Sequence, residues 1–116
     1  MKSIKILLAL SLAFLFFNFT TKEQDKPTIY TVGDSTVKNG AGKGDGGLWG
    51  WGDYIGQFLD ITKVNLENHA LGGTSSRTFQ QKGLWEAVYK KLKKGDYVMI
   101  QFGHNDDGPL NDDSRA

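Results

Sequence analysis

The chain has 116 residues, a net charge of +1 and no cysteine. The absence of cysteine excludes disulfides, a cysteine nucleophile and a thiolate metal site, and the near-neutral charge does not point to nucleic acid or a membrane surface as a partner. Fifteen glycines against two prolines indicate tight turns and close backbone approaches, not a disordered chain.

The N-terminus has the composition of an export signal. Lys2 and Lys5 precede an apolar run over 6–17, and a polar segment follows over 18–26. The apolar run is shorter than the ~20 residues that span a bilayer, and a basic start before a short apolar core is typical of a secretory signal. We therefore expect residues 1–26 to be a signal peptide with its exit segment, and the protein to be secreted or periplasmic. A buried N-terminal helix and an uncleaved membrane anchor are the alternatives.

A short strand followed by a polar turn opens the rest of the chain. Residues 28–32 are rich in strand formers, and Gly33 then allows the chain to turn. Ser35 follows at the carboxyl end of this strand, the edge where open α/β sheets bind ligands. Asp34 is expected to fix the turn through local hydrogen bonds. The alternative for Ser35 is a plain cap of a following helix.

The next loop, over 38–47, is rich in glycine. Gly42, Gly44 and Gly47 match the spacing of a dinucleotide-binding motif. That motif must follow its strand directly, whereas this match begins well after Val32, so we expect a flexible loop and no bound nucleotide.

A helix is predicted over 49–59. Its large apolar residues recur at helical spacing, which predicts an aromatic inner face; they are Trp51, Tyr54, Ile55, Phe58 and Leu59. Stacking of Trp49 or Trp51 on a sugar is the alternative to core packing.

Two more strands and one more helix complete the pattern. A second strand is predicted over 63–68, with Val64 and Leu66 facing inward, and it ends in small residues over 69–77. A helix then places four apolar residues on one face: Leu84, Ala87, Val88 and Leu92. Lysines crowd its end, where cations suit the helix dipole. The strand over 96–102 is apolar enough to be central, and we expect it to leave an exposed edge in a chain that stops at Ala116.

The predicted order is β-α-β-α-β, and right-handed crossovers make the three strands parallel. Their carboxyl ends bring Ser35, Gly73 and Asn105 to one edge. A serine hydroxyl can attack an ester carbonyl. The N–H groups of Ser35 and Gly73 and the Nδ2 of Asn105 can then stabilise the oxyanion. This set of groups predicts an acyl-transfer site.

Three motifs extend this prediction to a family. Residues 33–36, 68–73 and 103–106 resemble blocks I, II and III of the SGNH (GDSL-like) hydrolases. Four further stretches, over 38–40, 51–54, 75–77 and 95–98, are similar to the rhamnogalacturonan acetylesterase branch. The resemblance covers nearly everything after Lys26. It implies that residues 27–116 are the N-terminal part of an SGNH hydrolase domain, a flavodoxin-like three-layer α/β/α fold with a parallel sheet, truncated after the third strand.

The resemblance also implies a serine esterase without metal or cofactor. Ser35 would be the nucleophile, and Gly73 and Asn105 would complete the oxyanion hole with it. The implied partner is an acylated carbohydrate such as acetylated rhamnogalacturonan in pectin. We expect no nucleic acid, and no stable membrane partner unless the signal is uncleaved. Another deacylase of lipase or thioesterase type is one alternative. A non-catalytic binding module or truncated pseudoenzyme is the other.

The family's fourth block, an Asp-x-x-His that supplies the acid and base of the triad, has no match in the chain. Its two histidines, His69 and His104, are expected to anchor loops. Four aspartates lack the spacing of a calcium loop: Asp106, Asp107, Asp112 and Asp113. We therefore expect the triad acid and base to lie beyond Ala116 and this chain alone to be inactive.

Overall fold

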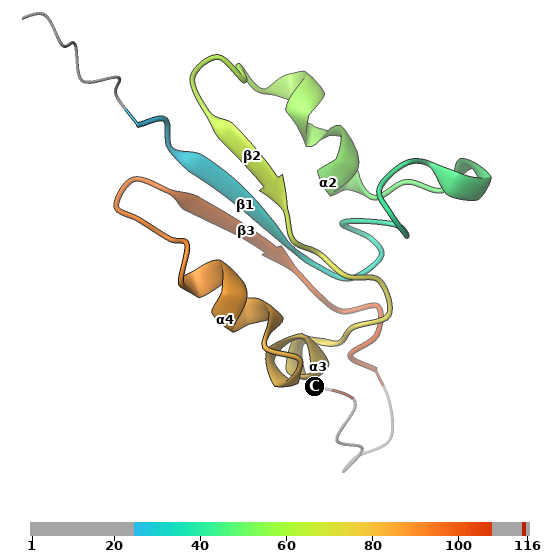
Figure 1. The fold of residues 1–116 in the computed structure, drawn as a ribbon. Helices are drawn as coiled ribbons and strands as arrows, with labels where there is room; N and C mark the ends of the chain where they lie inside the picture. The colour runs from blue at the N-terminus through green and yellow to red at the C-terminus, as the bar shows by residue number, and fades with distance from the viewer. Residues whose placement is uncertain (1–24, 108–114, 116) are drawn as a thin grey trace, which may run out of the picture.

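The computed structural model describes residues 25–107 and 115. In it, β1 spans Thr28–Gly33, β2 spans Asn65–Asn68 and β3 spans Tyr97–Gln101. The strands form one parallel sheet in the order β2–β1–β3 (Figure 1). The three predicted strands and their parallel arrangement are therefore confirmed. The expected signal peptide lies almost wholly outside the described residues.

The connections between the strands are short helices. They are the 3₁₀ helix η1 (Asp45–Gly47), α2 (Trp51–Tyr54), which continues as the 3₁₀ helix η2 (Ile55–Phe58), α3 (Ser76–Gln81) and α4 (Leu84–Tyr89). Within the described part of the chain, no helix is long and apolar enough to cross a membrane.

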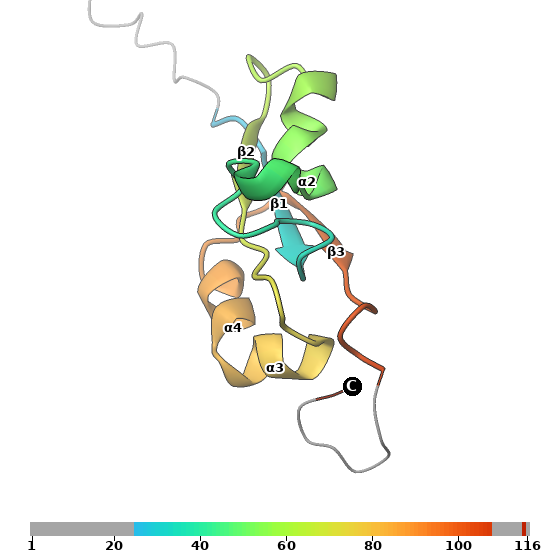
Figure 2. The same ribbon diagram turned by 90° about the vertical axis from the view of Figure 1, so that its right-hand side faces the viewer.

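The helices cover both faces of the sheet. Figure 2 shows α2 on one side, and α3 and α4 on the other. The chain moves outward from β1 to β2 through α2, and then returns past β1 to β3 through α3 and α4. Because right-handed crossovers in opposite directions place their helices on opposite faces, this order produces the predicted three-layer α/β/α arrangement.

The core lies between β1 and the α3–α4 pair. Tyr30, Val32, Phe79 and Val88 are buried there. The rings of Phe79 and Phe102 meet edge to face with centroids 5.3 Å apart, a geometry that suits the ring quadrupoles.

The apolar face predicted for α4 is present with one exception. Leu84, Val88 and Leu92 pack toward the core, whereas Ala87 is exposed. At about 100° per residue, Ala87 lies on the outer flank of the stripe. Trp85, on the opposite flank, packs inward in its place.

The aromatic inner face predicted for residues 49–59 is present only in part, since Trp51, Ile55 and Leu59 are half-buried. Phe58 is 84% exposed and Tyr54 39% exposed. Two glycines make the closest approach to neighbouring segments: a Cβ on Gly52 would lie 2.8 Å from Val37 and 2.9 Å from Asn68 of β2, and one on Gly56 would lie 3.3 Å from Leu66. The close approach at these glycines leaves no room for a large side chain there, and the rings of Tyr54 and Phe58 point to solvent.

A carboxylate joins the amino ends of two strands. Asp96, just before β3, accepts hydrogen bonds from the N–H of Thr28 at 2.7 Å and the N–H of Lys93 at 3.0 Å. The hydrogen bond from Thr28 lowers the pKa of the Asp96 carboxyl. β1 and β3 are therefore held together at the end of the sheet opposite to the polar loops.

Candidate active site

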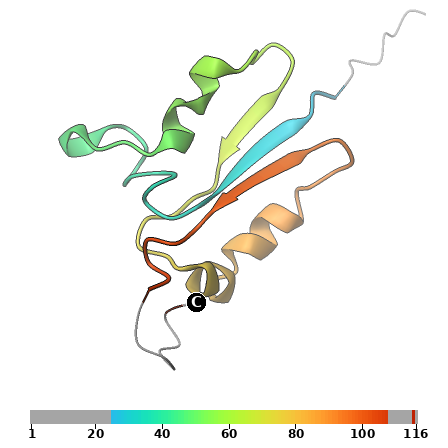
Figure 3. The same ribbon diagram turned by 180° about the vertical axis from the view of Figure 1, so that it is seen from behind.

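Three loops meet at the carboxyl edge of the sheet (Figure 3). Strand pairing continues beyond the strands themselves, since the N–H of His69 donates to the carbonyl of Thr31 at 2.8 Å and that of Leu71 to Gly33 at 2.9 Å. A Cβ on Gly72 would lie 3.5 Å from the Cβ of Ser35. The loop after β2 thus lies directly against the turn that contains Ser35.

The turn after β1 is fixed by Asp34, as predicted. This side chain is fully buried, and its Oδ1 accepts from the N–H and the hydroxyl of Thr36, both at 2.8 Å. The backbone carbonyl of Asp34 accepts from the N–H groups of Val37 and Lys38 at 3.1 Å. These bonds close a tight turn around Ser35.

Ser35 is half-buried, and no helix begins at it, so the capping alternative is wrong. Within residues 25–107 and 115, neither its hydroxyl nor its backbone N–H forms a hydrogen bond. Both groups are therefore available to a ligand at this edge.

Gly73 is exposed and has a φ of +78°. A side chain rarely adopts this backbone conformation, and space around the position of a Cβ is open to 4 Å. Among the described residues its N–H has no acceptor. The next residue is fixed, because the buried Thr74 donates its hydroxyl to the carbonyl of Leu71 at 2.7 Å.

Asn105 lies beside this segment. Its Nδ2 donates to the carbonyl of Thr74 at 3.1 Å. An amide nitrogen has two hydrogens, so one remains for a second acceptor. Arg115 Nη1 donates to the carbonyl of Asn105 at 2.8 Å. The structure thus brings the Asn105 amide next to the Gly73 segment, which in turn lies against Ser35.

Sequence reasoning missed a polar pair on the α2 side of β2. Asn68 Nδ2 donates to Asp53 Oδ1 at 3.0 Å, and Asn68 Oδ1 accepts from the N–H of Ala70 at 3.2 Å. Asp53 Oδ2 also accepts from the N–H of Gly50 at 3.0 Å. Both residues fall within the motifs quoted for the family resemblance, which is the one signal that marks them.

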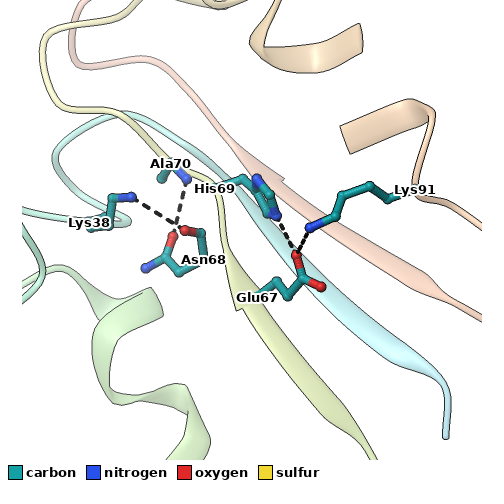
Figure 4. A network of polar contacts seen from close by, with 6 residues as sticks. All are labelled: Lys38, Glu67, Asn68, His69, Ala70 and Lys91. Atoms are coloured by element: carbon teal, nitrogen blue, oxygen red, sulfur yellow. Dashed lines mark hydrogen bonds and ion pairs between the residues drawn. The ribbon is translucent and has the colours of Figure 1, made fainter. Parts of the chain in front are cut away.

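A second polar group lies on the other face of β2, toward α4 (Figure 4). Glu67 accepts from His69 Nε2 at 2.7 Å and pairs with Lys91. The hydrogen bond from Lys91, and then that from His69, lowers the pKa of the Glu67 carboxyl. The ring of His69 also lies 5.7 Å from that of Tyr30, so this histidine anchors its segment as predicted.

His104 differs from its prediction. It is exposed and makes no polar contact with the rest of the described chain. The anchor of this loop is Asp106, whose Oδ1 accepts from the N–H of Ser76 at 2.6 Å. The described residues contain no group of three or more side chains that could hold a metal ion.

Comparisons with known proteins show which family the chain resembles. The model of the GDSL-like lipase/acylhydrolase family matches residues 29–113. A rhamnogalacturonan acetylesterase of Emericella nidulans is 42% identical over 87 residues, which cover 75% of this chain and 31% of that protein. The rhamnogalacturonan acetylesterase RhgT of Bacillus subtilis is 38% identical over 81 residues, which cover 70% of this chain and 34% of that protein.

A solved structure shares the fold. The crystal structure of the Bacillus subtilis protein YxiM matches with a TM-score of 0.60 and 37% sequence identity, over 70% of this chain and 23% of that one. The chain thus spans about a third or less of the length of these relatives, and it corresponds to the N-terminal portion of the rhamnogalacturonan acetylesterases.

Proposed function

Because this chain belongs to the GDSL-like lipase/acylhydrolase family, we propose that it contains the nucleophile and the oxyanion hole of a serine esterase. The complete enzyme removes acetyl groups from a polysaccharide such as rhamnogalacturonan. The observation that carries this proposal is the convergence of three loops, which brings the Gly72–Gly73 segment against Ser35 and the Asn105 amide against Thr74.

The chemistry follows from the available groups. The Oγ of Ser35 bonds to the acyl carbon while its proton passes to a base outside this chain, the histidine implied by the family's fourth block. The carbonyl oxygen becomes an anion, which accepts from the N–H groups of Ser35 and Gly73 and from the Nδ2 of Asn105. The carbon–oxygen bond to the sugar then breaks, and the sugar oxygen takes the proton. Water hydrolyses the acyl-serine and releases the acid.

The acetyl group and the rhamnogalacturonan substrate rest on the relatives. Two of them are named rhamnogalacturonan acetylesterases, and the identity to each exceeds a third of the matched residues. No metal or cofactor enters the proposed reaction, since a serine nucleophile and neutral donors suffice for ester hydrolysis.

Steady-state kinetics of the complete enzyme test the site. Ser35→Ala removes the nucleophile and should reduce turnover to background. Asn105→Ala removes one oxyanion donor and should lower kcat by roughly a hundredfold or more with little change in KM, because the bond matters most in the transition state. Asn65→Ala is the matched control, since Asn65 is exposed at the opposite end of the sheet. Wild-type kcat in Ser35→Ala would refute the assignment.

The choice of substrate separates the proposal from its alternatives. Release of acetate from acetylated rhamnogalacturonan supports the acetylesterase. Turnover of medium-chain acyl esters alone would identify a lipase-like or thioesterase-like deacylase instead. If the complete protein turns over neither substrate, it is a pseudoenzyme or a binding module.

We also propose that the protein is exported. The support is the sequence pattern alone, in which Lys2 and Lys5 precede the apolar run over 6–17. Mass spectrometry of the protein recovered outside the cytoplasm should find an N-terminus that lies after the apolar run over 6–17. A soluble cytoplasmic product that retains Met1 would contradict export.

A further inference from the structure

Two neighbouring side chains fasten the loop after β3 to the loop after β2. Asn105 Nδ2 donates to the Thr74 carbonyl at 3.1 Å, and Asp106 Oδ1 accepts from the Ser76 N–H at 2.6 Å. The second bond joins a carboxylate to a backbone donor, and bonds of this charge-assisted kind are the stronger class. The contact of Asp106 is therefore the firmer of the two.

The partner of Asp106 is itself held in place. Ser76 is the first residue of α3, and Ser75 caps this helix by exchanging hydrogen bonds with Thr78, at 3.1 Å and 2.8 Å. Phe79, one turn into the helix, is buried in the core. The cap leaves the Ser76 N–H without an acceptor inside its own helix. Asp106 supplies that acceptor from thirty positions away in the chain.

Besides the side-chain bonds of Asn105 and Asp106, the loop that contains Asn105 is held by Arg115, whose Nη1 donates to the Asn105 carbonyl at 2.8 Å, and by Phe102, whose ring packs on Phe79. The backbone of this loop closes a turn through the bond from the Asp106 N–H to the Gly103 carbonyl at 3.1 Å, and Gly103 has a φ of +149°. Both His104 and Asp107 are exposed. Among these contacts, only that of Asp106 ties the turn to the backbone of α3, so it helps to set the distance between this turn and the segment that contains Gly73.

We propose that Asp106 is a positioning residue for Asn105. It binds the fixed end of α3 and so aims the second hydrogen of the Asn105 amide at the oxyanion. This inference rests on the proposed function, because it takes Asn105 as an oxyanion donor. Asp106 itself does not touch the reacting atoms.

The test is a double-mutant cycle in the complete enzyme. Misplacing a catalytic donor lowers the rate steeply, so Asp106→Ala should lower kcat by roughly ten- to a hundredfold with KM nearly unchanged. In the Asn105→Ala background the same change should cost no more than about twofold, because the donor it positions is already absent. Asp106→Asn keeps an acceptor oxygen and should restore most of kcat. Asp107→Ala, on the same turn, is the control and should match wild type.

The bond can also be removed from the other side. Ser76→Pro deletes the N–H donor at the first position of a helix, where proline is tolerated. The preceding Ser75 has φ −85° and ψ 170°, an extended conformation compatible with a following proline. Ser76→Pro should therefore lower kcat by the same factor as the loss of the Asp106 side chain, roughly ten- to a hundredfold. It tests the Asp106–Ser76 bond independently if Asp106→Ala folds poorly.

The outcomes separate the inference from the proposed function. If Ser35→Ala is inactive while Asp106→Ala and Ser76→Pro keep wild-type kcat, the positioning role is wrong and the esterase assignment stands. Equal losses from Asp106→Ala with and without Asn105 would also overturn it, because they show an effect independent of the amide. If Ser35→Ala remains active, the proposed function and the inference both fail.

Discussion

The side-chain amide of Asn68 donates a 3.0 Å hydrogen bond to Oδ1 of Asp53, joining the end of β2 to α2. The same nitrogen lies 3.4 Å from the carbonyl of Val37, in the segment that follows the Ser35 turn. Asp53 in turn accepts from the N–H of Gly50, just before α2. The Asn68–Asp53 pair thus connects the end of β2, α2 and the segment that follows the Ser35 turn.

Removing this amide should destabilise the protein. Asn68→Ala removes the donor to Asp53 Oδ1 and the acceptor of the N–H of the buried Ala70, and a buried group left unsatisfied costs about 1–3 kcal/mol of unfolding free energy. Urea denaturation of the complete enzyme measures the change. Asn65→Ala on the same strand is the control, because its amide is exposed and makes one long 3.4 Å contact. Equal denaturation midpoints for the two variants would show that the Asn68–Asp53 pair is not a stabilising contact.

Gly33 should not tolerate even a methyl group. A Cβ there would lie 2.2 Å from the carbonyl oxygen of Gln101 and 2.4 Å from Cγ2 of Val37. Overpacking of this kind costs typically about 1–3 kcal/mol, and here it falls on the β1–β3 pairing. We expect a clearly lower Tm for Gly33→Ala by calorimetry.

Gly56→Ala is the matched control for this steric prediction. Its Cβ would lie 3.3 Å from Cδ2 of Leu66, the end of a side chain that can move, and alanine is the better helix former. A Tm for Gly33→Ala at or above that of Gly56→Ala would contradict the close approach of β1 and β3.

The Glu67 pair predicts a pH-dependent contribution to stability. Its carboxyl has a pKa below the ordinary value of 4.5, owing first to Lys91 and then to His69. A group whose pKa is lower in the folded state stabilises the fold above its unfolded pKa, and that stability is lost as the pH falls through the folded pKa. Glu67→Gln should therefore lower the Tm at pH 7 and have little effect in acid, below the lowered pKa.

The salt dependence of the Tm gives a second test of the Glu67–Lys91 pair. The side chains of Glu67 and Lys91 are 36% and 47% exposed, so their attraction is modest and screened by ions. The Tm difference at pH 7 should shrink as salt is added. Glu86→Gln, which removes an exposed 3.4 Å contact with Lys90 on α4, is the control. If the decrease in Tm caused by Glu67→Gln grew toward acid pH, the stabilising role of the ionised Glu67 carboxylate would be contradicted.

The outer edge of β3 should make residues 27–116 prone to association when expressed alone. Tyr97 is 62% and Ile100 57% exposed, and Ile100 lines an apolar cavity of about 260 Å³ with Trp85 and Phe102. Because unpaired, apolar strand edges favour association, Ile100→Lys should raise the soluble fraction measured after centrifugation, whereas Thr62→Lys in an exposed turn should not. A monomeric, cooperatively unfolding wild-type fragment would refute this expectation.

The architecture was predictable because its signals are local. β1 and β3 are short apolar runs that end at glycine and polar residues, and the periodicity of α4 marks its buried face. Once these elements alternate along the chain, right-handed crossovers leave a parallel sheet as the expected arrangement. Parallel strands end at one edge, so the order of the elements was enough to place Ser35, Gly73 and Asn105 together.

The sequence by itself thus determined the type and order of the elements and the edge where the polar groups gather. Only the tertiary structure decided which contacts hold the elements and the polar groups in place. Gly52 faces Val37 and Asn68 so closely that a glycine, not an aromatic ring, makes the closest contact of α2. Asp106, one of several acidic residues near the chain's end, finds its donor at Ser76, thirty positions away. Periodicity and propensity report the preferences of neighbouring residues, whereas these contacts depend on distances between segments that only packing sets.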